Sequence, residues 1–110
     1  MNKELGKKFD AGKTPVVSGA LEYFSRAIRS VAGVSDYGFK KYGSWGGWVD
    51  VPDARRRYTD ALGRHLLDEL SGKVIDEESG LYNDVMSAWN ALARVELRLR
   101  ELEQKSETTG

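Results

Sequence analysis

The stretch that decides the fold is DARRRYTDALGRHLLDELSG, residues 53–72. Asp53 is a residue type preferred at helix N-caps, and Gly72 is the type that most often follows the end of a helix. Between them, the apolar residues recur at four-residue steps, which places them on one helical face: Tyr58, Leu62, Leu66 and Leu70. The sequence therefore predicts an amphipathic helix over this stretch.

Two further helices are predicted on either side of this one. The first covers residues 18–33, with Gly33 as its stop and one apolar face: Leu21, Phe24, Ile28 and Val31. The second has Asp76 as its candidate N-cap and a longer apolar face at near-heptad spacing: Leu81, Val85, Trp89, Leu92, Val95 and Leu99. The predicted fold class is mainly α, a small helical domain of about three main helices.

A segment rich in glycine and aromatic residues separates the first two predicted helices. Residues 36–52, DYGFKKYGSWGGWVDVP, show neither a helical nor a strand period. The glycines make the segment costly to order, and long loops inside compact domains are usually functional or disordered. The aromatic content argues against disorder. We therefore predict an ordered functional loop here.

Composition limits the classes to which the protein can belong. A chain of 110 residues fits one domain. Because so short a chain buries a limited core, we expect a homo-oligomer. Lys plus Arg and Asp plus Glu both number 17, giving a formal net charge of zero. This balance argues against a nucleic-acid duplex as partner, so any anion site must be a local cluster.

The absence of cysteine excludes thiolate catalysis and Cys-ligated zinc, and it favours the reducing cytoplasm as the location. No apolar run approaches the roughly 20 residues that span a bilayer. The first ten residues are polar and lack the apolar segment of a signal peptide. We therefore expect no membrane partner.

Several basic residues are candidate phosphate contacts. Lys13 follows Gly12, but the glycine spacing of a P-loop is missing, which leaves Lys13 as a simple phosphate contact. Arg57 closes an arginine triplet at a predicted helix start, where guanidinium and free N–H groups can face a phosphate together. Solvated surface charge is the alternative for the triplet. Arg64 and His65 lie in mid-helix, and a partly buried structural histidine is the alternative for His65.

Other side chains suit a base or a metal ion. The loop aromatics can stack on a base or pack on the core: Phe39, Tyr42, Trp45 and Trp48. Asn90 interrupts an apolar face, and a base edge would satisfy its amide. Carboxylates gather around the turn between the last two helices: Asp68, Glu69, Asp76, Glu77, Glu78 and Asp84. Such clusters hold Mg²⁺ or Mn²⁺ by oxygen ligation, or they serve as helix caps and solvated charge.

Several segments occur together in an order typical of a known family: residues 8–13, KFDAGK; 38–45, GFKKYGSW; 57–66, RYTDALGRHL; 76–81, DEESGL; and 89–90, WN. Over residues 7–97 the chain resembles the N-terminal domain of phage-encoded dATP/dGTP diphosphohydrolases, some of which are joined to MazG-like pyrophosphohydrolases. The resemblance implies a phage or prophage origin and a nucleotide ligand.

The chain also departs from the pattern of that family. Where two histidines usually follow the Ser-Gly-Leu segment, this chain has Asn83 and Met86. Met86 cannot ligate a hard metal ion, and the ExxE…ExxD carboxylate signature of MazG-type enzymes is missing. A triphosphate-cleaving site normally needs several carboxylates for its metals. The chain therefore retains the residues expected to face a base and phosphates but lacks the full set of metal ligands.

Two functions from different classes follow. The first is a non-catalytic binder, without cofactor, that sequesters a nucleotide or cyclic-nucleotide signal, similar in role to small helical sponges that counter bacterial defence. Its nucleotide-binding residues would be Lys13, Lys40, Tyr42, Trp45, Arg57, Arg64, His65, Tyr82 and Asn90. The second is an Mg²⁺- or Mn²⁺-dependent dATP/dGTP pyrophosphohydrolase that releases the monophosphate. Its metal ligands would be Asp68, Glu69, Asp76, Glu78 and Asp84.

A helical assembly protein without ligand is the third alternative. In the nucleotide-binding interpretation, the chain divides into an extended N-terminal arm (1–15), a helical nucleotide-binding domain (16–103) and a flexible tail (104–110). The polar composition of the first and last segments supports these boundaries.

Overall fold

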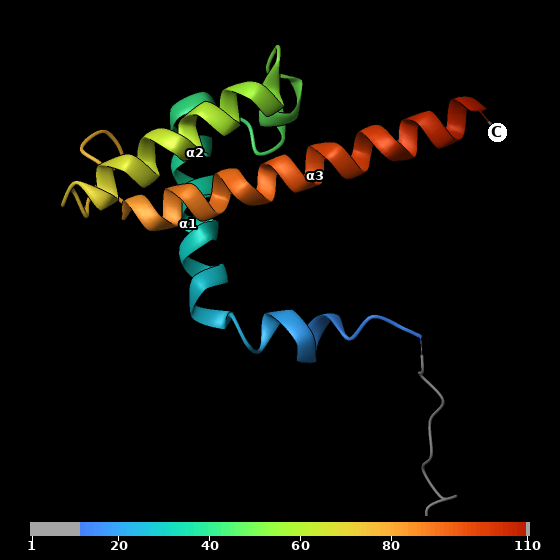
Figure 1. Ribbon diagram of the computed structural model, residues 1–110, viewed down its shortest axis with the longest axis horizontal. Helices are drawn as coiled ribbons and strands as arrows, with labels where there is room; N and C mark the ends of the chain where they lie inside the picture. Colours follow the sequence, from blue (N-terminus) through green and yellow to red (C-terminus); the bar gives the residue numbers. More distant parts are fainter. Residues whose placement is uncertain (1–11, 110) are drawn as a thin grey trace, which may run out of the picture.

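The computed structural model describes residues 12–109, and its long elements are all helices (Figure 1). The elements follow one another as η1 (Val17–Leu21), α1 (Ser25–Tyr42), η2 (Gly47–Asp50), α2 (Ala54–Leu70) and α3 (Asn83–Thr109). The predicted fold class, mainly α with three main helices and a loop rich in glycine and aromatic residues, is confirmed. Among the described residues, no helix is long and apolar enough to cross a bilayer.

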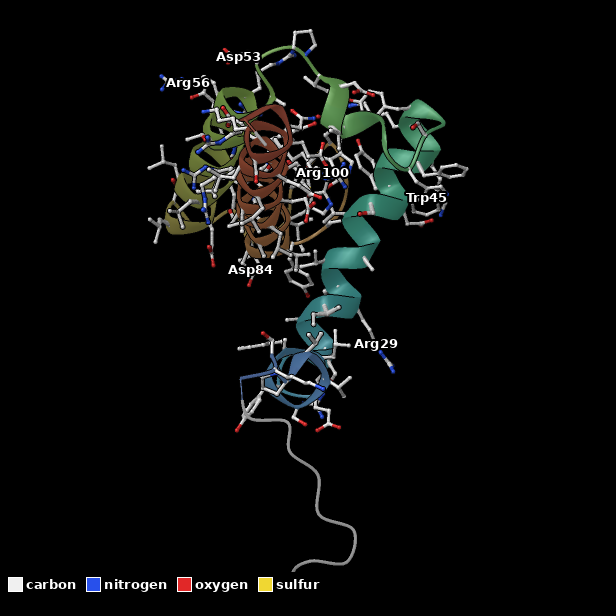
Figure 2. The ribbon with its side chains drawn as sticks, turned by 90° about the vertical axis from the view of Figure 1, so that its right-hand side faces the viewer. Arg29, Trp45, Asp53, Arg56, Asp84 and Arg100 are labelled. Carbon is white, nitrogen blue, oxygen red and sulfur yellow. The ribbon has the colours of Figure 1, made fainter. Side chains whose placement is uncertain are left out.

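Helices α2 and α3 run antiparallel, side by side, and α1 crosses them steeply (Figure 1). Arg55 in the first turn of α2 forms an ion pair of 3.5 Å with Glu101, late in α3. At the other end, His65 contacts Asn83, the first residue of α3. Looking along α3 from its C-terminal end, α2 lies on one side and α1 on the other (Figure 2).

The predicted boundaries of the first helix are wrong. The chain from Val17 to Leu21 forms a short π-helical turn, and the backbone breaks at Phe24 before α1 begins at Ser25. Helix α1 then continues through Gly33 and ends only at Gly43, whose N–H donates to the Phe39 carbonyl at 2.7 Å. A glycine inside a helix costs only about 1 kcal/mol, so packing of α1 against α3 overrides it.

The loop rich in glycine and aromatic residues is therefore shorter than predicted. Residues 36–42 belong to the last turns of α1, and only residues 43–53 connect α1 to α2. Gly43 opens the loop with a φ of 75°, the left-handed conformation that glycine adopts without strain. Three glycines and two tryptophans remain in this connection.

Helix α2 forms over the predicted stretch, but its start lacks the predicted cap chemistry. Asp53 occupies the N-cap position with a φ of 54° and makes no side-chain hydrogen bond to the helix. The predicted cap of the third helix is also wrong, because Asp76 serves a turn instead. Its Oδ2 accepts hydrogen bonds from the Ser79 N–H at 2.9 Å and the Ser79 hydroxyl at 2.6 Å. Helix α3 begins seven residues later, at Asn83.

Aromatic side chains form the centre of the packing. Trp48, Tyr58 and Trp89 meet edge to face, with ring centroids 5.5–6.1 Å apart. Such contacts contribute about 0.5–1.5 kcal/mol each beyond the burial of their area. The buried apolar residues of the described chain are only Val34 and Ala93. Much of the predicted apolar face of α3 is exposed.

The described residues leave part of the domain division untested. Residues 1–11 of the predicted arm lie outside the described part of the chain. Helix α3 continues to Thr109, so residues 104–109 of the predicted tail are drawn as helix. Homo-oligomerisation stays a prediction.

Two glycine substitutions test the position at which α1 ends. Gly33→Ala is expected to raise the free energy of unfolding by about 0.5–1 kcal/mol, because Gly33 is inside the helix with open space for a Cβ. Gly43→Ala is expected to lower it by about 1 kcal/mol, because its φ is 75°. Urea unfolding measures both. Destabilisation by Gly33→Ala would place the end of the helix at Gly33 instead.

Candidate functional site

A cavity of about 900 Å³ lies where α1, the loop after it, α2 and the start of α3 meet. Helix α1 and the loop contribute Lys41 and Trp45 to its wall, and α2 contributes Arg57 and Arg64. Asn90 lines it from α3. The volume lies within the range of 300–1,000 Å³ that is typical of small-molecule sites.

Six of the nine predicted nucleotide-binding residues line this cavity: Tyr42, Trp45, Arg57, Arg64, His65 and Asn90. The other three lie elsewhere. Lys13 is exposed near the start of the described chain, and Lys40 forms an exposed ion pair of 2.9 Å with Asp36, one turn earlier in α1. Tyr82 is 56% exposed and pairs with Ile75 in an isolated antiparallel bridge.

The two cavity arginines share one face of α2. Arg57 and Arg64 are seven residues apart, which is two helical turns and about 10 Å along the axis. Neither forms an ion pair with any of residues 12–109. Their neighbour Arg56 lies outside the lining, where its Nε is 3.7 Å from Asp60. The cavity therefore holds two guanidinium groups available to an anion.

The aromatic residues of the site differ in how much of each ring is free. Trp45 stacks on Phe39 with ring centroids 4.5 Å apart and an interplanar angle of 12°. It lies beside the C-terminal end of α1 (Figure 2), and it is 58% exposed. Tyr42 is 74% exposed. One face of the Trp45 indole is therefore covered, and the remaining exposure leaves room for a second ring.

Trp48, Tyr58 and Trp89 form an aromatic wall of the cavity, and Tyr58 and Trp89 were not among the predicted site residues. The Tyr58 hydroxyl donates to the Trp48 carbonyl at 2.7 Å, and the Trp89 indole N–H donates to the Ser35 hydroxyl at 3.0 Å. The first bond joins α2 to the loop after α1, and the second joins α3 to α1. Tyr58 and Trp89 stand inside the family motifs, which was the signal available in the sequence.

His65 is oriented by Asn83. Because an amide oxygen only accepts hydrogen bonds, the 2.7 Å contact between His65 Nδ1 and Asn83 Oδ1 places the proton on Nδ1. The Asn83 Nδ2 donates to the Lys73 carbonyl at 2.9 Å, which fixes the amide orientation. The Nε2 atom of His65 makes no hydrogen bond to the described residues. It is therefore free to contact a ligand in the cavity.

Lys41, which was not among the predicted site residues, lines the cavity, whereas Lys40 does not. The Lys41 ammonium bonds the Glu78 carboxylate, and the Tyr37 hydroxyl donates to the same carboxylate oxygen at 3.3 Å. This hydrogen bond to Glu78 raises the pKa of Lys41, and the bond from Lys41 lowers the pKa of Glu78. Both lysines occur in one motif, but adjacent helical residues diverge by about 100°, so only one faces the cavity.

The candidate metal ligands are divided between the cavity and the outside. Asp68, Asp76 and Glu78 line the cavity, whereas Glu69 and Asp84 do not. Within residues 12–109, no three His, Cys, Asp or Glu side chains are grouped so that they could hold a metal ion. Burial raises the pKa of Asp76, but the hydrogen bonds from the Ser79 hydroxyl and N–H, together with electrostatic attraction to His65 and Arg64, outweigh this effect and lower the pKa overall.

Segments 38–45, 57–66, 76–81 and 89–90 each contribute side chains to the one cavity. A family model described as dATP/dGTP diphosphohydrolase, N-terminal, matches residues 3–107. The chain belongs to this family. The resemblance seen in the sequence is therefore confirmed. Neither the comparison with curated proteins nor that with solved structures finds a match. Four of the five segments that carry the resemblance therefore form walls of the cavity.

The lowered pKa of Asp76 predicts a pH-dependent effect of Asp76→Asn on stability. A carboxylate whose pKa is lowered by folding stabilises the fold above its ordinary pKa and loses this contribution as the pH falls. At pH 7 the wild type should be more stable than Asp76→Asn by roughly 1 kcal/mol. The difference should shrink below about pH 4.

Urea unfolding at several pH values measures this difference, with Glu77→Gln as the matched control. Glu77 is exposed and makes no hydrogen bond or ion pair to the described residues, so its substitution should have little effect at any pH. A difference for Asp76→Asn that grows on acidification would contradict the assignment.

Proposed function

We propose that the cavity binds a nucleotide and that the chain holds this ligand without hydrolysing it. The observation that carries the proposal is the pair of arginines, Arg57 and Arg64, which line a cavity with aromatic walls and form no side-chain hydrogen bond or ion pair within residues 12–109. The family description, which names dATP and dGTP, supports a nucleotide as the ligand class.

In this proposal, the arginines of α2 bind the phosphate groups. Guanidinium groups bind phosphate oxygens through paired N–H donors, and such charge-assisted hydrogen bonds are about twice as strong as neutral ones. The spacing of about 10 Å along α2 suits two phosphate groups of one ligand, either in a chain or across a cyclic nucleotide. His65, whose Nε2 makes no hydrogen bond to the described residues, also lines the cavity.

Base recognition falls to Trp45 and Asn90. A base stacked on an aromatic side chain gains about 1–3 kcal/mol. Asn90 is only 5% exposed, lines the cavity, and uses its Nδ2 to donate to the Met86 carbonyl at 2.9 Å. Its Oδ1 makes no hydrogen bond to the described residues, so a base N–H donor would satisfy it.

Binding without hydrolysis is supported by the state of the acidic residues. Glu78 is neutralised by Lys41, and Asp76 is engaged by Ser79. A cofactor-free binder of this kind would act in the cytoplasm by sequestering a nucleotide or cyclic-nucleotide signal. In a phage, this sequestration would serve as counter-defence, as a homo-oligomer and without a nucleic-acid duplex as partner.

A metal-dependent dATP/dGTP pyrophosphohydrolase is the second candidate. It is favoured by the family description and by the presence of Asp68, Asp76 and Glu78 on the wall of one cavity. Mg²⁺ or Mn²⁺ would be the cofactor. Within residues 12–109, the side chains do not form a group of ligands for either ion.

Adjacent arginines provide a matched test of the phosphate site. Arg57→Ala should weaken nucleotide binding about tenfold or more, because it removes hydrogen bonds to a charged ligand. Arg56→Ala removes the same charge from the next residue, outside the cavity, and should change affinity little. Isothermal titration with dATP, dGTP and a cyclic dinucleotide measures both. Equal losses for the two variants would place the phosphates elsewhere.

Incubation of the protein with dATP or dGTP and either Mg²⁺ or Mn²⁺, followed by chromatography, tests hydrolysis. The nucleotide is expected to be recovered intact, because Glu78 and Asp76 are engaged by protein partners. Release of monophosphate and pyrophosphate that is lost in Glu78→Gln would instead establish the enzyme.

A further inference from the structure

A row of exposed apolar side chains follows α3 on the side turned away from its buried residues. The row, here called the α3 stripe, consists of Leu92, Val95, Leu99 and Leu102, whose exposed fractions lie between 46% and 57%. The residues of α3 that the chain itself buries are the small or polar Asn83, Asn90 and Ala93. The last turns of α3 project past the other helices (Figure 1). The stripe stays about half exposed, with Trp48 and Trp89 beside Leu92 and Val95 at one end.

The stripe has the spacing of a coiled-coil seam. Its steps alternate between three and four residues, which places Leu92 and Leu99 at a positions and Val95 and Leu102 at d positions of two heptads. Val85 and Ala88 continue the same alternation one heptad earlier, closer to α1. A seam of this kind buries its apolar residues only against another helix.

The charges beside the stripe select the orientation of that other helix. Arg98 is at a g position and Glu103 is at the following e position, five residues later. Neither forms an ion pair within residues 12–109. They do not pair with each other within one helix, because such partners are three or four residues apart. In a parallel pair of such helices, each g residue faces the e residue five positions later in the other helix. An antiparallel pair would bring like charges together.

We infer that the α3 stripe is a dimer seam, occupied by α3 of a second copy of this chain in parallel register. Arg98 of each copy then pairs with Glu103 of the other, and the four apolar residues are buried against their equivalents. A seam of two heptads would be marginal for free peptides. Here α2 already holds α3 in its helical form, so association need not order it.

The seam adjoins the proposed nucleotide site but does not depend on it. Leu92, Val95 and Glu96 line a smaller hollow of about 370 Å³, whose other walls include Trp48 and Trp89 of the main cavity. A second copy on the stripe would therefore cover this hollow from outside. The inference rests on α3 alone and would stand if the cavity bound no nucleotide.

A single introduced cysteine tests the seam directly, because the 110-residue chain has no cysteine of its own. In parallel register, position 99 of one copy lies opposite position 99 of the other, so Leu99→Cys should form a disulfide dimer on mild oxidation. Arg56→Cys is the matched control, since Arg56 is exposed on α2 and points away from α3 (Figure 2). Cross-linking of Leu99→Cys no faster than that of the control would overturn the inference.

Light scattering of the unmodified chain gives an independent measure. We expect twice the chain mass of 12.3 kDa, and the mass of one chain for Leu99→Glu with unchanged helical circular dichroism. Because Leu99 is 50% exposed, this substitution does not enter the core. A single-chain mass for the unmodified protein at 100 μM would overturn the inference.

Charge reversal tests the orientation. Arg98→Glu and Glu103→Arg should each weaken the dimer about tenfold, and the double variant should restore it. Dimer dissociation followed by sedimentation measures these effects. Strengthening by either single reversal would indicate antiparallel pairing and would contradict the parallel seam.

Discussion

The buried amide of Asn83 is the contact on which the arrangement of α2 and α3 depends. Asn83 is fully buried, and its N–H, Nδ2 and Oδ1 engage the Val74 carbonyl, the Lys73 carbonyl and the His65 ring respectively. Three hydrogen bonds thus join the start of α3 to the turn before it and to α2. An unpaired amide at this depth would cost about 1–3 kcal/mol for each lost group.

The functional site follows from this junction. With α2 held antiparallel to α3, one face of α2 is directed to the space where α1 ends, and that face carries Arg57, Arg64 and His65. The same bond that joins the helices sets the His65 proton on Nδ1 and leaves Nε2 to the cavity. A hydrogen bond from the Trp89 indole N–H to the Ser35 hydroxyl joins α3 to α1. Stability and recognition therefore use the same side chains.

Sequence periodicity predicted where helices form better than where they begin, end and pack. Helix α2 agrees with prediction because its apolar spacing and its terminal residues give the same answer. Helix α1 differs from the prediction, because Gly33 indicates a helix end in the sequence but lies inside the helix in the structure. Asp76 reads as a helix cap, yet its carboxylate closes a local turn with Ser79.

The limits of prediction in the site have a similar cause. Residue chemistry selected Arg57 and Arg64 as separate candidates, and the structure places both on the wall of one cavity. Spacing does not show which face another element meets, so Lys40 was selected although Lys41 lines the cavity. The spacing likewise predicted an apolar face on α3 without showing that much of this face stays exposed in the single chain. The motifs of the family located the cavity walls more completely than periodicity did.

The most direct test of the account is the response of the arginine side chains to a nucleotide. The Nε–H signals of Arg57 and Arg64 can be followed in ¹⁵N-labelled protein by NMR during titration with dATP, dGTP and a cyclic dinucleotide. We expect a bound nucleotide to shift both signals together, while that of Arg56 stays in place. Saturation by a nucleotide with both signals unmoved would contradict the proposal that this cavity is the binding site.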